Sequence, residues 1–243
     1  MTAYDELPQA IRSAVDNLPD RIFQRSVSIF YSGKEAFAAD APLYVLGLNP
    51  GGTPSALPTA TVAAYLKRFK DRDQPWCEYA DESWEGAASG TWGMQPRVLH
   101  MFGQLGLDPR TVPASNVVFV NTRNERDLAQ EKDELLDLCW PVHAAVINSL
   151  KVSTIVCFGG TAGLWARTKL GASEMIDSFT EENSRGWTSR THRNPDGIQV
   201  LTVTHPSRAD WRNPLADPTP LVRRALEGGV KGIAPLAMDP RGV

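Results

Sequence analysis

The fold is decided by residues 43–52, which read Leu43-Tyr44-Val45-Leu46-Gly47-Leu48-Asn49-Pro50-Gly51-Gly52. The first half is a short apolar run typical of a buried parallel strand, and the second half is a turn that begins with an asparagine. A second run of this kind, Val200-Leu201-Thr202-Val203, is followed by Thr204-His205-Pro206-Ser207. In an open α/β sheet, ligands bind outside the carboxyl ends of the strands. The pattern therefore predicts that Asn49 and His205 face one cleft.

Two further apolar runs, at 116–121 and 154–158, also predict buried strands, and helical periodicity fills the segments between strands. The expected helices include 97–106, where Gly106 suits a C-terminal cap, and 131–150. Four apolar strands separated by helices predict an α/β fold, namely a three-layer α/β/α sandwich with a mostly parallel four-stranded central sheet.

The chain of 243 residues is expected to form a single domain over 1–243, with a helical region over 1–40 and an irregular tail over 229–243. Residues 190–203 predict a hairpin, because an Asn-Pro-Asp-Gly turn lies between two strand-like segments. Residues 53–91 form a long insertion that is rich in Gly, Pro, Thr and Ser, and loops of this length in compact domains are usually functional.

Composition excludes several classes of protein. No apolar run approaches the length of a membrane span and no secretory signal is recognisable at the N-terminus, so a cytoplasmic (nucleoid-associated) or nuclear location is expected. The three cysteines are an odd number without C-x-x-C spacing, so neither a disulfide framework nor a zinc site is indicated. An α/β hydrolase or nucleotide-binding enzyme is disfavoured, because no G-x-S-x-G, G-x-x-x-x-G-K-[ST] or G-x-G-x-x-G motif follows a strand.

Charge is unevenly spread along the chain. The net charge is −3, yet residues 185–231 hold eight Lys or Arg against four Asp or Glu. This segment is a candidate basic face for phosphates, and a solvated surface is the alternative interpretation.

The motifs together resemble the uracil-DNA glycosylase superfamily over about residues 42–214. Residues 47–51 are similar to the G-[IM]-N-P-G motif of the mismatch-specific and single-strand-selective monofunctional branches, and residues 205–207 resemble the H-P-S motif that binds the base. Residues 118–121 resemble the second strand, whose terminal Asn reads uracil, and residues 157–162 resemble the turn after the third strand. The resemblance implies a monofunctional DNA glycosylase that flips uracil or a related deaminated base out of DNA, with DNA as partner and without metal or cofactor.

The expected catalytic residues are Asn49 and His205. A neutral His205 can donate a hydrogen bond to the negative charge that develops on the leaving base, whereas a His that caps a strand is the structural alternative. Asn49 can orient a water toward the sugar, although an amide is a poor general base and the residue would equally support a turn.

The base is expected to contact the first motif, an aromatic ring and an amide. Gly51 stands where the most uracil-strict branch has a Tyr, which implies a roomier pocket for 5-substituted uracils or hypoxanthine. Asn121 offers the donor and acceptor that match uracil, and a turn residue is its alternative role. Trp76 and Trp84 compete with Trp92 as the stacking ring. The predicted base-binding residues are Gly47, Leu48, Pro50, Gly51, Trp92 and Asn121.

The predicted DNA-binding residues follow His205 in the chain: Ser207, Arg208, Trp211 and Arg212. Arg208 or Trp211 would fill the space left by the flipped nucleotide, and Arg212 would contact phosphate. The alternative function is a catalytically inactive or weakly active superfamily member that binds nucleic acid or a nucleobase.

Overall fold

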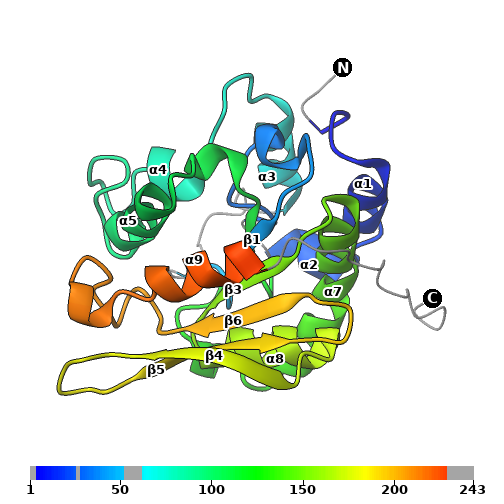
Figure 1. The fold of residues 1–243 in the computed structure, drawn as a ribbon. Coiled ribbons are helices and arrows are strands. Elements are labelled where there is room, and N and C mark those ends of the chain that lie inside the picture. The colour runs from blue at the N-terminus through cyan, green and yellow to red at the C-terminus, as the bar shows by residue number, and fades with distance from the viewer. Residues whose placement is uncertain (1–3, 26–27, 52–61, 229–243) are drawn as a thin grey trace.

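The structure is a computed structural model that describes residues 4–25, 28–51 and 62–228 (Figure 1). In chain order its elements are α1 (Gln9–Asp16), α2 (Asp20–Arg25), β1 (Leu43–Gly47), α3 (Val62–Lys70), α4 (Glu78–Asp81), α5 (Gln95–Leu105), β2 (Ala114–Asn116), α6 (Glu125–Leu128), α7 (Lys132–Ser149), β3 (Thr154–Phe158), α8 (Gly160–Leu170), β4 (Glu174–Thr180), β5 (Thr188–Arg193), β6 (Gln199–Val203) and α9 (Thr219–Gly228), with short 3₁₀ helices at Lys34–Phe37, Pro109–Thr111 and Pro214–Ala216. The predicted tail over 229–243 and part of the 53–91 insertion lie outside the described residues.

The described strands form one six-stranded mixed sheet in the order β2-β1-β3-β6-β5-β4. The first four strands of this order run parallel to one another. Strand β5 then pairs antiparallel with β6, and β4 pairs antiparallel with β5. Parallel strands bring their carboxyl ends to one edge of the sheet. The loops after β1 and β6, which carry the two motifs, therefore leave the same edge.

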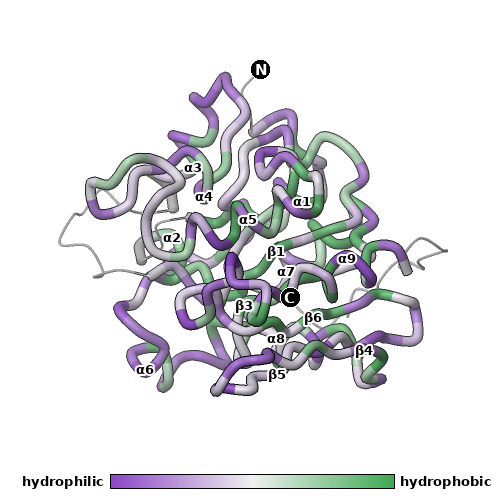
Figure 2. The backbone as a smooth tube through the Cα atoms, turned by 60° about the vertical axis from the view of Figure 1, so that its left-hand side comes forward, coloured by the Kyte–Doolittle hydropathy of each residue, from purple (hydrophilic) through white to green (hydrophobic). Residues whose placement is uncertain are grey.

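Helices cover both faces of the sheet, and neighbouring strand residues alternate between the two cores. In β1, Tyr44 belongs to one hydrophobic cluster and Val45 to the other, and in β3 the same holds for Cys157 and Phe158. Burial on both faces explains the continuous apolar runs that predicted these strands. Figure 2 shows hydrophobic segments gathered at the centre of the molecule around β3 and hydrophilic ones at the periphery, as at α6.

The prediction of a four-stranded sheet was wrong. The hairpin predicted over 190–203 is present as β5 and β6, and a further strand, β4, pairs with β5 at the edge of the sheet. Most side chains of β4 are exposed, including Met175 and Ile176. An edge strand exposed on both faces has neither a continuous apolar run nor strict alternation, so periodicity missed it.

The position of the second strand was also wrong. The strand predicted over 116–121 is instead β2, which covers Ala114–Asn116, and the following residues hydrogen-bond to the last residue of β1 and to the turn after it. Val117 donates its N–H to the carbonyl of Gly47, and Val118 donates to that of Leu48. The asparagine at the carboxyl end of β2 is therefore Asn116 and not Asn121.

The predicted helices agree better with the structure than the predicted strands do. Helix α5 has Pro96 in its first turn and ends at Gly106, whose φ of 70° lies in the left-handed region that glycine tolerates. Helix α7 runs without a break through Pro141, and α1 and α2 occupy the predicted N-terminal helical region. Among the described residues, the helices are all too short or too polar to cross a lipid bilayer.

Candidate functional site

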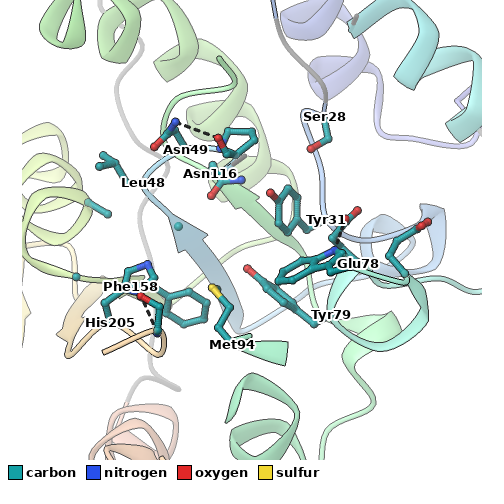
Figure 3. Close-up of a pocket in the computed structure, with 18 of the residues that line it drawn as sticks. Ser28, Tyr31, Leu48, Asn49, Glu78, Tyr79, Met94, Asn116, Phe158 and His205 are labelled. Carbon is teal, nitrogen blue, oxygen red and sulfur yellow. Dashed lines mark hydrogen bonds between the residues drawn. The ribbon is translucent and has the colours of Figure 1, made fainter. Parts of the chain in front are cut away.

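A pocket of about 1010 Å³ opens at the carboxyl ends of the parallel strands (Figure 3). Its lining includes Asn49 from the turn after β1 and His205 from the loop after β6, so the structure brings the two predicted catalytic residues together. Gly159, at the end of β3, has a φ of 92° and packs against the His205 ring. A side chain is strained in this backbone conformation, which makes glycine the residue that fits here.

The His205 ring is held in one orientation and one tautomer. The backbone N–H of Ser207 donates to its Nδ1 at 3.1 Å, and the Ser207 Oγ lies 2.8 Å from the same atom. A ring nitrogen that accepts from a backbone N–H carries no proton, so a neutral His205 has its proton on Nε2. Burial, and secondarily the charge of Arg208, lowers the pKa of His205 below its ordinary value. The imidazole is therefore a neutral donor at neutral pH.

Two residues anchor the loop that carries His205. Arg97, from α5, donates to the carbonyl oxygen of Pro206 at 2.5 Å and lies 3.6 Å from a carboxylate oxygen of Asp210. Trp211 is fully buried, packs against Phe158 and donates its indole N–H to the carbonyl of Thr204 at 3.2 Å. The predicted DNA contact of Trp211 is therefore wrong, because the ring belongs to the core beneath the loop.

Asn49 is tied into the turn that follows β1. Its Nδ2 lies 2.8 Å from the Thr122 Oγ1, 3.2 Å from the carbonyl oxygen of Val120 and 3.1 Å from that of Pro50. Because the amide nitrogen is occupied in this way, the amide oxygen is the acceptor that this side chain offers to a water. The residue thus has the turn-supporting role that the sequence left open, and its water-positioning role stays a prediction.

The structure brings most of the predicted base-binding residues to the pocket, and Asn121 is the exception. Gly47, Leu48, Pro50 and Gly51 line it, as does Trp92, which is 49% exposed at the rim. Asn121 is buried away from the lining and donates its Nδ2 to the carbonyl oxygen of Gly51 at 2.9 Å. Its predicted contact with the base is therefore replaced by a structural hydrogen bond to the turn.

Asn116 takes the place in the pocket that was predicted for Asn121. It is 4% exposed and lines the pocket, and its buried Nδ2 forms no hydrogen bond of ordinary length within the described residues, although its amide lies near enough to the Tyr31 hydroxyl to lower the pKa of that phenol against the effect of burial. Its amide oxygen lies against Gly47, at which no side chain fits. A buried polar group without a full partner costs free energy, so this nitrogen, which lies on a pocket residue, is a candidate to donate to a ligand.

A row of aromatic rings lines the pocket from His205 to Tyr31, and the sequence did not identify it. The ring centroids are 6.4 Å apart between His205 and Phe158, 6.2 Å between Phe158 and Tyr79, and 5.5 Å between Tyr79 and Tyr31. Tyr79 is fully buried, and its hydroxyl has no partner among the described residues. Rings from β3 and the start of α4 therefore line the pocket together with Trp92, whose stacking on a base stays a prediction.

Glu78 adds a partly buried carboxyl to the same pocket (Figure 3). Its Oε1 accepts a hydrogen bond from the indole Nε1 of Trp84 at 2.9 Å. Burial raises the pKa of Glu78 to about 7, although the Trp84 hydrogen bond acts in the opposite direction. The aromatic residues of the insertion thus surround an ionisable group that titrates near neutral pH.

The remaining predicted DNA-binding residues lie at or near the rim. Ser207 and Arg208 are exposed and line the pocket. Arg212 is also exposed, but it forms a two-point ion pair with Asp210, at 2.8 and 2.9 Å. Arg208 is therefore the rim cation better placed to meet a phosphate.

Nothing in the described part of the chain brings three His, Cys, Asp or Glu side chains together as a metal site would require. No known family model and no curated protein matches this chain.

Proposed function

We propose that this protein is a monofunctional DNA glycosylase of the uracil-DNA glycosylase type, which removes uracil or a related deaminated base by hydrolysis of its N-glycosidic bond. The observation that carries the proposal is the neutral, Nε2-protonated His205, held by Ser207 in the pocket that Asn49 also lines. A strand-end Asn and a His donor in one pocket match the resemblance found in the sequence.

In the proposed reaction, the nucleotide is flipped into the pocket and its base lies along the aromatic row. The bond between the sugar and the base breaks, and the electron pair leaves with the base. Nε2–H of His205 donates a hydrogen bond to the base oxygen on which the negative charge develops. The amide oxygen of Asn49 accepts a hydrogen bond from the water that attacks the sugar carbon. The water keeps one proton in the new hydroxyl group on the sugar and loses the other to solvent, and the departing base anion takes up one proton from solvent, so that an abasic site and the free base remain.

The position of Asn116 supports a role in distinguishing uracil from bases that carry an amino group. A carbonyl oxygen on the base would give its Nδ2 the acceptor that it lacks within the described residues. The amino group of cytosine or adenine would instead oppose one donor with another, which disfavours these bases.

The experiment is incubation of the protein with an oligonucleotide that contains one uracil, followed by alkaline cleavage of abasic sites. We expect cleavage at the uracil and none at a cytosine in the same position, on either a single strand or a duplex. The His205→Ala protein, prepared in parallel, excludes a contaminating enzyme. Absence of cleavage on both substrates would overturn the proposal.

A second function, binding of nucleic acid or a nucleobase without cleavage, is favoured by the use of Asn49 in the turn. An amide is a poor general base, and this one is also bound to its neighbours. Fluorescence anisotropy with the same labelled oligonucleotides separates the two functions, because a binding protein retains affinity for uracil DNA while it releases no base.

A further inference from the structure

The inner part of the pocket holds two buried hydrogen-bond donors that lack acceptors among the described residues. They are the Asn116 Nδ2 and the Tyr79 hydroxyl, on side chains that are 4% and 0% exposed. Both residues line the pocket, and Figure 3 shows the Tyr79 hydroxyl pointing into it. A buried donor without an acceptor is unfavourable, and the Asn116 amide has only a contact with the Tyr31 hydroxyl, so a ligand that offers two acceptors would be stabilised in this pocket.

We propose that the Tyr79 hydroxyl is a specificity-determining group that, together with Asn116, selects bases with carbonyl oxygens over bases with amino groups. This inference rests on the proposed function, since it assigns the base edge that the same pocket reads. The ligand class is an oxo base, which covers uracil, 5-substituted uracils and hypoxanthine.

The chemistry of the two donors explains the selection. An amide nitrogen only donates, so the Asn116 Nδ2 can donate to a carbonyl oxygen of the base but forms no hydrogen bond with an amino group. A phenol both donates and accepts, so an amino group can donate to Tyr79 but leaves the phenol's own proton unpaired. A carbonyl oxygen pairs that proton. Burial raises the pKa of Tyr79 well above its ordinary value, so the phenol keeps the proton that it donates.

Access to both donors requires a small rearrangement, because each atom is almost closed off from water. Met94 also lines the pocket. Its unbranched side chain has three rotatable bonds, so this part of the lining can change shape at low cost.

The chain offers a matched control in Tyr65, which lines the same pocket and is also buried, at 4% exposure. Its hydroxyl is already paired, because it donates to the carbonyl oxygen of Phe30 at 2.7 Å and accepts from the Phe30 N–H at 3.2 Å. Tyr79→Phe removes an unpaired hydroxyl, whereas Tyr65→Phe removes a paired one. Both variants lose a phenol oxygen, but only the oxygen of Tyr65 forms hydrogen bonds within the protein.

The test measures binding of uracil and cytosine, and of hypoxanthine and adenine, by calorimetry on the wild type and both variants. We expect Tyr79→Phe to lower the preference for the oxo base about 3- to 10-fold, the scale of one net hydrogen bond. Tyr65→Phe should leave the preference unchanged. Urea unfolding without ligand should show Tyr79→Phe at or above the wild-type midpoint and Tyr65→Phe below it.

The inference is overturned if Tyr79→Phe keeps the wild-type preference, if both variants lose it equally, or if the wild type binds oxo and amino bases alike or binds neither. A lower midpoint for Tyr79→Phe would also overturn it, since that result would mean that the hydroxyl has a structural partner. Because binding is read without cleavage, a protein that binds uracil selectively but releases no base from DNA refutes the proposed glycosylase and not this inference.

Discussion

Gly47 and Asn116 are Cα partners at the ends of the parallel strands β1 and β2, and the amide oxygen of Asn116 fills the space that a side chain at Gly47 would need. The pairing presses that oxygen against the β1 backbone and leaves the amide nitrogen in the pocket. A backbone contact between two strands thus orients the group that we expect to read the base.

Gly47→Ala should therefore displace Asn116. Because overpacking a well-packed site costs about 1–3 kcal/mol, we expect the free energy of unfolding to fall by that amount and uracil release to slow. Gly160→Ala is the control, since Gly160 lines the same pocket and nothing lies within 4 Å of the added methyl group. Urea unfolding and single-turnover cleavage measure the two effects. A Gly47→Ala protein with wild-type rates would mean that the orientation of Asn116 is unimportant.

His205→Ala should slow uracil release about 10²- to 10³-fold, the scale of losing one donor to a developing negative charge. The fold should persist, because the ring lies in a loop at the pocket. His100→Ala is the control, since His100 pairs with Asp217 at 3.1 Å, outside the pocket lining. Single-turnover rates on a uracil oligonucleotide test the prediction, and parental activity in His205→Ala would make His205 structural.

Arg97→Ala should loosen the loop behind His205, because it removes the donor to Pro206 and the ion pair with Asp210. We expect the cleavage rate to fall about 10-fold, since a misplaced donor stabilises the leaving base less well. Arg97→Lys should restore part of the rate. Arg193→Ala, which removes an exposed pair with Glu174, should have no effect. If Arg97→Lys and Arg97→Ala lower the cleavage rate equally, packing of the guanidinium and not its positive charge would be responsible.

Glu78 should make stability fall as pH rises from about 4.5 to about 7. In this window the folded protein, in which the pKa of Glu78 is raised to about 7, binds more protons than the unfolded chain, so the free energy of unfolding decreases with pH. Glu78→Gln should flatten this part of the profile, as measured by urea unfolding at several pH values. Glu174→Gln is the control, because Glu174 is an exposed carboxylate that pairs with Arg193, and this variant should keep the wild-type pH profile. An unchanged slope in Glu78→Gln would show that the carboxyl ionises normally.

Arg208→Ala should lower the slope of log affinity against log salt by about 1 for DNA binding, because one phosphate contact and its counterion release are lost. Arg212→Ala should change the slope less, since Arg212 is already neutralised by Asp210. Anisotropy titrations of both variants at several salt concentrations give the slopes. A DNA affinity that does not change with salt concentration would indicate that the protein binds free bases and not DNA.

The sequence alone determined the elements that are buried on both faces or capped by clear signals. Strand β3 and helix α5 were predicted almost to the residue, because a continuous apolar run and a Pro-to-Gly helix pattern depend on nearby residues. The joint placement of Asn49 and His205 also followed from sequence, since parallel strands end at one edge of the sheet.

Tertiary structure alone decided which asparagine enters the pocket and which aromatic rings line it. Asn116 and Asn121 lie five residues apart at the two ends of one apolar run, 117–120, and the register of β2 against β1 selects between them. Trp211 and Tyr79 are both aromatic residues in loop-like sequence, yet one is packed beneath a loop and the other reaches the pocket. Register, side-chain burial and the pairing of each polar atom arise from contacts between segments distant in the chain, and local sequence patterns do not encode them.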